Sequence, residues 1–401
     1  MPHRYKQCGT RINIDLKMRV FVFLFIILIG GGCRTTPNET GKNISVYKVD
    51  LDKAKEISTS EIFSHIDIIP LKTPDTVVCS GIRSTVYKDN IFFLDWRQKI
   101  ILCFDLNGNF RYQINSKGRG PKEYSDILAI STDQYNDYLM VLDRQSMLQF
   151  DLSGNFIKKI KYPEGLVVHS AKMINQDTMF CITVTNNKPE RKIINYLSLK
   201  DNKIIASCYS EDPIFPVTED AFDYNNKSYY AISKAPFVYS VNKLKLIPEY
   251  KWDFGKYNYD YNDLTPPVFK NKKDLLKNQQ RWLYKNCPWL IGMIAENYHY
   301  KYARIIFPSN TDYLKEQIPT YHIFWNKKTE NYKIVPRFKE GDVFHIFSSW
   351  TDHAVYCAIE KSMLPQFIDI KVLTPENQKI IEELPEDCNP IVLKYVFKKD
   401  E

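Results

Sequence analysis

Two short charged segments carry residue types that could bind an ion or a polar ligand. Asp95 and Arg97 follow one apolar run, and Asp143 and Arg144 follow a second, similar run. Carboxylates and guanidinium groups around one mouth of a channel would form a charged ring for such a ligand. The same positions also suit a structural role, in which each carboxylate caps a turn by accepting backbone N–H groups. The residue types alone allow both interpretations.

A third candidate lies in the segment GRGPKEY at Gly118–Tyr124, where Arg119 and Glu123 could face the same ligand. Two glycines and a proline exclude a regular helix or strand here. The alternative is a connection between two elements, in which the glycines adopt positive φ and the charges pair in solvent. The sequence leaves both possibilities open.

Two tryptophans mark a possible partner-binding element. Trp282 and Trp289 belong to Asn271–Tyr298, whose lysines, glutamines and leucines predict a helical insertion. Seven residues make two helical turns, which would place both rings on one face if the helix continued. Pro288 is expected to end or kink that helix at Cys287. Exposed, the rings would anchor a partner; buried, they would fasten the insertion to the rest of the protein.

The sequence contains no recognisable catalytic signature, so no catalytic residue is assigned. There is no G-x-S-x-G segment and no C-x-x-C pair. The histidines of the last third would have to converge in threes to hold a metal, and ordinary half-buried histidines explain them better. We therefore predict no metal site and no cofactor.

The segments that position these residues repeat along the chain. Leu94–Phe110 reads LDWRQKIILCFDLNGNF, and Leu142–Phe156 reads LDRQSMLQFDLSGNF. The aromatic residues Phe104, Phe150 and Tyr196 recur at intervals of 46 residues. A period in the forties with strand-like content is typical of β-propeller blades.

The repeat predicts an all-β fold, a six-bladed β-propeller, with seven blades as the alternative. A propeller must close its ring, because an open ring leaves two unpaired sheet edges. We expect the strand at Ile66–Leu71 to pair with Ile391–Phe397 in the last blade, which also takes in Val343–Phe347. A short helix is expected near Pro375–Leu384.

The N-terminal segment resembles a bacterial lipoprotein signal peptide. Val20–Ile29 is an apolar run of ten residues, preceded by basic residues and followed by three glycines and Cys33. Ten residues are too short to span a membrane as a helix but suit a signal-peptide core. We expect residues 1–33 to be the signal and lipobox, with acylation of Cys33, residues 34–43 a tether, and residues 44–401 the propeller.

The bulk charge excludes one class of partner. The net charge is +8 for the whole chain and falls to about +4 on maturation, because five basic residues and one acidic residue leave. With no concentrated basic stripe, the sequence does not indicate a nucleic-acid-binding protein. A mixed-sign surface is expected, and a monomer.

Three motifs carry a resemblance to a known family: GRGPKEY, the two LD…FDLxGNF units and the terminal NPIVLKYVF at Asn389–Phe397. The chain resembles the six-bladed β-propeller lipoproteins of Bacteroides-type bacteria, with NHL-like repeats. That resemblance implies an outer-membrane lipoprotein. The absence of an acidic run after Cys33 favours the periplasmic face, with surface display as the alternative.

The preferred hypothesis is a non-catalytic, lipid-anchored module that binds a glycan, a peptide or an envelope protein. The alternative is a hydrolase or lyase that uses the axial funnel of the propeller. An enzyme needs several titratable groups converging at one mouth with perturbed pKa values, whereas a binding module needs only an aromatic or charged rim.

Overall fold

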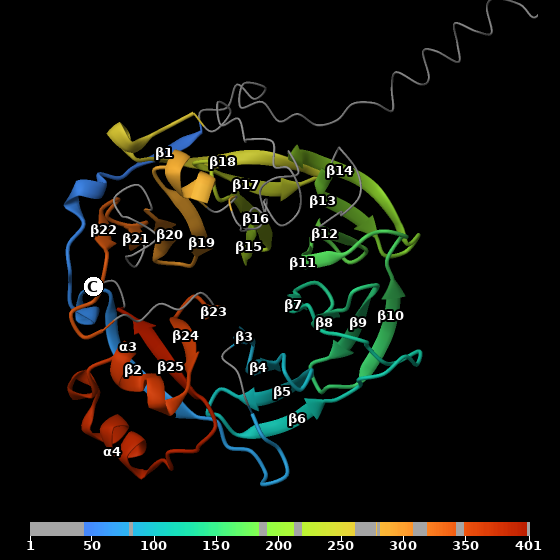
Figure 1. Ribbon diagram of the computed structural model, residues 1–401, viewed down its shortest axis with the longest axis horizontal. Coiled ribbons are helices and arrows are strands. Elements are labelled where there is room, and N and C mark those ends of the chain that lie inside the picture. Colours follow the sequence, from blue (N-terminus) through green and yellow to red (C-terminus); the bar gives the residue numbers. More distant parts are fainter. Residues whose placement is uncertain are drawn as a thin grey trace, which may run out of the picture.

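The described strands form six sheets arranged in a ring, the six blades of a β-propeller (Figure 1). A computed structural model describes residues 44–79, 83–183, 191–211, 219–260, 278, 281–307, 319–341 and 349–398. The expected signal segment, Cys33, the tether and Val343–Phe347 lie outside these residues. Within the described ranges, no helix has the length and apolar character needed to cross a membrane.

Blades one to three follow the sequence repeat, with four antiparallel strands each. Blade one contains β3 (Arg83–Tyr87), β4 (Asn90–Asp95), β5 (Ile100–Asp105) and β6 (Phe110–Ile114). Blade two contains β7 (Ala129–Asp133), β8 (Tyr138–Leu142), β9 (Ser146–Asp151) and β10 (Phe156–Lys161). Blade three contains β11 (Val168–Met173), β12 (Thr178–Thr183), β13 (Arg191–Ser198) and β14 (Lys203–Glu211).

Blades four to six complete the ring and use two strands from the N-terminal segment. Blade four contains β15 (Glu219–Tyr224), β16 (Lys227–Ile232), β17 (Phe237–Asn242), β18 (Lys245–Asp253) and, parallel to β18, β1 (Ser45–Lys48). Blade five contains β19 (Leu290–Glu296), β20 (Tyr300–Ile306), β21 (Thr320–Asn326) and β22 (Tyr332–Val335). Blade six contains β23 (Ser349–Trp350), β24 (Ala354–Ile359), β25 (Ile391–Phe397) and β2 (Phe63–Pro70). Between β24 and β25 lie α3 (Leu364–Phe367) and α4 (Pro375–Glu383).

Burial within a blade depends on the position of the strand. Every residue of the second strand β4 is buried, whereas the outer strand β6 alternates between exposed and buried positions. The middle strands are packed on both faces by the neighbouring blades, so they read as continuous apolar runs. The tight turn between β5 and β6 needs glycine, because Gly108 has φ +81° and a Cβ there would lie 2.1 Å from the carbonyl oxygen of Pro70.

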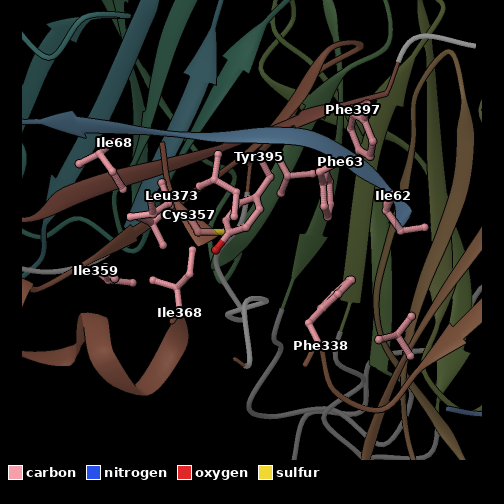
Figure 2. Close-up of a cluster of buried hydrophobic side chains, with 14 of the residues drawn as sticks. Ile62, Phe63, Ile68, Phe338, Cys357, Ile359, Ile368, Leu373, Tyr395 and Phe397 are labelled. Carbon is pink, nitrogen blue, oxygen red and sulfur yellow. The ribbon is translucent and has the colours of Figure 1, made fainter. Parts of the chain in front are cut away.

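The expected ring closure is confirmed. β2 pairs antiparallel with β25, with Ile66 opposite Tyr395, Ile68 opposite Leu393 and Ile69 opposite Val392. Phe63 of β2 packs its ring against those of Tyr395 and Phe397, at centroid distances of 5.3 and 5.2 Å (Figure 2). The short helix near Pro375–Leu384 is also confirmed as α4, whose Asn377 donates from Nδ2 to the carbonyl oxygen of Ile66 at 2.9 Å.

The predicted helical insertion at Asn271–Tyr298 is wrong in its second half. Residues 281–286 are helical and the helix ends before Pro288, as expected, but Leu290–Glu296 forms β19, the first strand of blade five. Most of 271–280 lies outside the described residues. The strand is explained by apolar side chains such as Leu290, Ile291 and Ile294, all buried against blade four or within blade five.

We expect Phe63→Ala to destabilise the protein by about 3–5 kcal/mol, because it empties an aromatic site at the seam that closes the ring. Urea unfolding at pH 7 would measure the change. Ile157→Ala on β10, where the side chain is exposed, is the control and should shift the free energy of unfolding by less than about 0.5 kcal/mol. Equal effects of the two substitutions would contradict a load on this seam.

Candidate functional site

The candidate residues lie at one end of the propeller because strand direction alternates within each blade. The turns from second to third strands and the connections between blades share this end, which we call the connection end. The turn 96–99 of blade one and the turn 143–145 of blade two are equivalent, and the connection 115–128 runs between these blades. The structure therefore brings Asp95, Arg97, Asp143 and Arg144 to the same end.

The carboxylate of Asp95 caps the turn that follows β4. Its Oδ1 accepts the backbone N–H groups of Arg97 at 3.0 Å and Gln98 at 2.9 Å, and its Oδ2 accepts from Nε2 of Gln98 at 2.7 Å. The side chain is fully buried. This is the capping role that the sequence had left open, so Asp95 shapes the turn and does not present a free carboxylate.

The carboxylate of Asp143 holds the connection between blades one and two. Oδ1 accepts from Ser125 Oγ at 2.9 Å, Asp126 N at 3.1 Å and Arg144 N at 2.7 Å. Oδ2 accepts from the backbone N–H of Ser125 at 3.2 Å and from Oγ of Ser146 at 3.4 Å. Asp143 therefore fixes the position of residues 125–126 relative to the turn of blade two.

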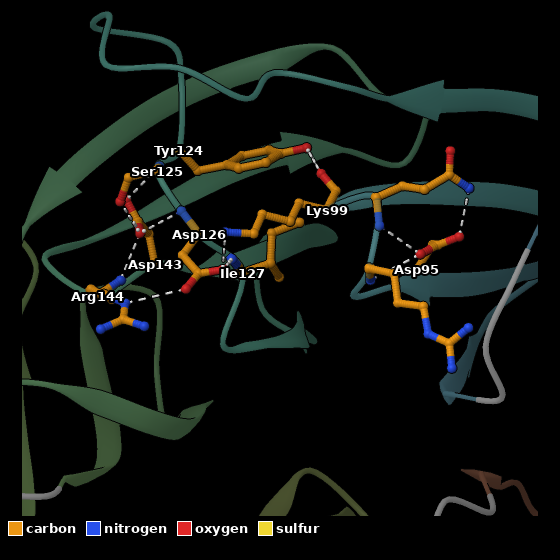
Figure 3. A network of polar contacts seen from close by, with 10 residues as sticks. Asp95, Lys99, Tyr124, Ser125, Asp126, Ile127, Asp143 and Arg144 are labelled. Carbon is orange, nitrogen blue, oxygen red and sulfur yellow. Dashed lines mark hydrogen bonds and ion pairs between the residues drawn. The ribbon is translucent and has the colours of Figure 1, made fainter.

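Lys99, Asp126 and Arg144 form a charged network across the two blades (Figure 3). Nζ of Lys99 lies 3.0 Å from Oδ1 of Asp126, and Nε of Arg144 lies 3.2 Å from Oδ2. The buried Tyr124 fastens the same connection by donating its hydroxyl to the carbonyl oxygen of Lys99 at 2.8 Å. Burial favours a higher pKa for Asp126, but hydrogen bonds from Lys99 and Arg144 outweigh it and lower the pKa.

Two apolar side chains and two arginines remain exposed beside this network. Trp96 is 57% exposed, and the guanidinium of Arg97 lies 5.6 Å from the centre of its ring. Val78 is also exposed, and its carbonyl oxygen accepts from Nε2 of Gln98 at 3.0 Å. Arg144 keeps most of its side chain in solvent. We call Val78, Trp96, Arg97 and Arg144 the Trp96 patch.

The GRGPKEY loop lies away from this patch. Oε2 of Glu123 accepts from the backbone N–H of Gly120 at 2.6 Å, and Nζ of Lys159 donates to the carbonyl oxygen of Glu123. Lys159 belongs to β10, the outermost strand of blade two, so the loop packs at the periphery rather than at the axis. Arg119 is exposed there. The structure thus separates Arg119 and Glu123 from the other four predicted ligand-binding residues.

The two tryptophans of the predicted insertion have different environments. Trp289 is 1% exposed, and its ring packs against Phe254 and Tyr259 while Nε1 donates to the carbonyl oxygen of Tyr257 at 3.0 Å. That side chain fastens the connection to the core and is not available to a partner. Trp282 is half-buried on the short helix 281–286, and its partner-binding role stays a prediction.

Sequence reasoning missed Trp96, although a signal was present. The first repeat reads LDWRQK where the second reads LDRQS, so Trp96 is an extra residue inserted directly after the capping Asp. An aromatic residue added to an otherwise repeated turn is not needed for the turn itself. Comparing the two copies position by position would have singled it out.

The opposite end of the propeller is occupied by contacts between blades. Its turns join first to second strands, and hydrogen bonds or ion pairs connect one blade to another around the ring. They include Tyr87 Oη to Asp137 Oδ1, Lys172 Nζ to Asp223 Oδ2, Lys327 Nζ to Tyr224 Oη and Val86 N to Ser349 Oγ. Across the described ranges, no group of three His, Cys, Asp or Glu side chains is placed to hold a metal ion.

Fold and patch together define a six-bladed β-propeller with an exposed aromatic and basic patch at its connection end. The family described as "Domain of unknown function (DUF4934)" matches residues 42–396, and the chain belongs to that family. No protein with curated function matches the sequence.

Two solved structures from Bacteroides are similar in fold. One is a "Putative exported protein" from Bacteroides fragilis, with 14% identity, a TM-score of 0.67, and coverage of 89% of this chain and 100% of that one. The other is a member of the DUF4221 family from Bacteroides vulgatus, with 12% identity, a TM-score of 0.51, and coverage of 84% and 98%. At these identities the likeness concerns the fold alone.

We expect Asp126→Asn to lower the free energy of unfolding near pH 7 by about 0.5–1 kcal/mol, the range of a partly exposed ion pair. The pKa of Asp126 is lower in the folded state than its unfolded value of about 3.9. The stabilisation is therefore present above that value and is lost as the pH falls through the lowered pKa.

Urea unfolding between neutral and acidic pH would measure this difference. Asp89→Asn, at an exposed position of blade one, is the control and should leave the curve nearly unchanged. A difference between wild type and Asp126→Asn that persists at the most acidic pH would contradict the role of the ionised carboxylate.

Proposed function

We propose that this protein is a non-catalytic binding module of the bacterial cell envelope and that the Trp96 patch contacts its ligand. The observation that carries the proposal is the exposure of Trp96 beside the guanidinium of Arg97. A tryptophan is rarely left in water, because burying its large apolar surface is favourable. Tryptophan and arginine are also the residues that contribute most at binding interfaces.

The chemistry of the patch indicates the kind of ligand. The indole of Trp96 offers a flat apolar surface that suits a sugar ring or an aromatic side chain. Arg97 and Arg144 extend into solvent, and guanidinium groups recognise carboxylates by paired hydrogen bonds. The ligand we propose is therefore a glycan, a peptide or an envelope protein that carries an acidic group beside a flat or apolar one.

The carboxylates next to the patch support binding over catalysis. A hydrolase or lyase needs an acid or base poised near neutral pH. Asp95 and Asp143 are engaged by backbone and hydroxyl donors, and the pKa of Asp126 is lowered while its oxygens face Lys99 and Arg144. These groups stabilise turns and a network, so the arrangement favours a binding surface.

An envelope location with a lipid anchor at Cys33 belongs to the same proposal. The apolar run Val20–Ile29 before Cys33 supports it, as does the similarity in fold to a protein described as exported. β1 runs parallel to β18, with Ser45 opposite Tyr250 and Lys48 opposite Asp253, and so points towards the connection end. The chain thus enters the fold from the other side, which would leave the Trp96 patch facing away from an anchoring membrane.

We expect Trp96→Ala to weaken ligand binding about tenfold or more without changing the melting temperature, because the ring is exposed. A glycan array and an acidic-peptide panel would identify the ligand, and calorimetry would compare the variants. Tyr298→Ala is the matched control, since Tyr298 is 68% exposed in a turn at the opposite end. Equal loss in both variants, or no loss in Trp96→Ala, would refute the patch.

We expect Cys33→Ser to release the protein from the membrane fraction into the soluble fraction, because the thiol that carries the lipid would be gone. Cell fractionation followed by immunoblotting measures the distribution. Cys8→Ser, in the same N-terminal segment, is the control and should leave the protein in the membrane fraction. Retention of Cys33→Ser in the membrane to the wild-type extent would refute lipidation at this residue.

A further inference from the structure

The side chain of Arg304 on β20 is a buried cation with little compensation. It is 6% exposed, and Nη2 donates to the carbonyl oxygen of Gly292 at 3.2 Å. Nε has no hydrogen-bond partner, and none of the ion pairs found among the described residues involves Arg304. A guanidinium removed from water without a counter-ion is costly, so such a group is usually paired or binds an anion.

The neighbouring polar side chains do not supply the missing negative charge. His322 lies opposite Arg304 in the β20–β21 pair, and its Nδ1 is 2.8 Å from the hydroxyl of Tyr302. Burial, with a further contribution from Arg304, lowers the pKa of His322 to about 3. Both His322 and Tyr302 are therefore neutral at physiological pH and leave the charge of Arg304 uncompensated.

Gly292 leaves space at the edge of the guanidinium that can bind an anion. A Cβ at this position would lie 3.3 Å from both Nε and Nη2 of Arg304. Nε and Nη2 form the edge with which arginine binds the two oxygens of a carboxylate. Gly292 also lies at the register shift between Ile291 and Met293, a bulge of the kind that often occurs beside binding sites.

This position is open to the inside of the ring. β19 is the first strand of blade five and lies nearest the centre of the propeller (Figure 1). Gly292 is partly exposed, although the arginine behind it is buried. An anion that reaches β19 from the axis would therefore meet Nε and Nη2 directly, without a side chain in between.

We propose that Arg304 is the receptor for the carboxylate group of a small ligand, which binds across Gly292 on the inner strand of blade five. The planar Nε–Nη2 edge matches the two oxygens of a carboxylate. The ligand supplies the counter-charge that the described side chains do not. This site is separate from the Trp96 patch, so either can fail without the other.

Isothermal titration calorimetry of the mature chain with sodium acetate, D-glucuronate and inorganic phosphate tests the site. Acetate presents the carboxylate alone and D-glucuronate presents it on a sugar. Binding of either acid that weakens about tenfold or more in Arg304→Met supports the proposal, since that variant removes a charged hydrogen-bonding group. Tighter binding of D-glucuronate than of acetate would assign the ligand to the sugar acids.

Gly292→Ala is the second variant, because its Cβ occupies the proposed site while Arg304 keeps its charge. It should also lose binding of the acids. Arg337→Met, which removes an exposed arginine between blades five and six, is the matched control and should bind as wild type does. The melting temperature of Arg304→Met without ligand should not fall, because removing an uncompensated buried charge does not destabilise a protein.

Three results would overturn the proposal. They are acid binding unchanged in Arg304→Met, acid binding unchanged in Gly292→Ala, and tighter binding of phosphate than of either carboxylate. A clear fall in the melting temperature of ligand-free Arg304→Met would also overturn it, because that result would mean that the arginine stabilises the fold and is not held for a ligand.

Discussion

The pairing of β2 with β25 is the interaction on which the rest of the structure depends. Each blade packs only against its neighbours, so a ring that is not fastened at one point can open at two sheet edges. Here eight residues from the N-terminal segment form the outer strand of the last blade. The same segment first adds β1 to blade four and then contacts blade five through Lys55, whose N–H donates to the carbonyl oxygen of Ile334 at 3.2 Å. The N-terminal segment thus binds three consecutive blades from outside.

Once the ring is closed, acidic residues shape its connection end and basic and aromatic residues are left to make contacts. Asp95 and Asp143 use their carboxylates on backbone N–H groups, which are the donors that turns leave unpaired. Asp126 joins Lys99 to Arg144 across two blades. Because these carboxylates are internally satisfied, the groups that remain in solvent are the indole of Trp96 and the guanidinium groups beside it. The division explains why the conspicuous acidic residues of the sequence stabilise the fold while a less conspicuous tryptophan is exposed.

Much of the fold could be predicted from the sequence, and the failures have physical causes. Phe104, Phe150 and Tyr196 recur at one interval, and the structure places each in the third strand of its blade, on β5, β9 and β13. The error at β19 arose because a helix-favouring stretch precedes Pro288 directly, and the strand that follows is a short apolar run without clear alternation. Such a run fits a buried helix or a buried strand equally well. Only its pairing with β20 decides between them.

The sequence by itself determined the strands, the glycine turns and the capping carboxylates, because each of these depends on residues close together in the chain. Gly108 must be glycine for its turn, and Asp95 finds its donors within three residues. The tertiary structure alone decided which candidates share an end of the propeller, why Trp289 is buried whereas Trp96 is exposed, and that Arg304 faces Gly292. These outcomes depend on which strands and blades meet across the ring. Burial and charge compensation are set by such distant neighbours, and a local pattern of residues does not contain them.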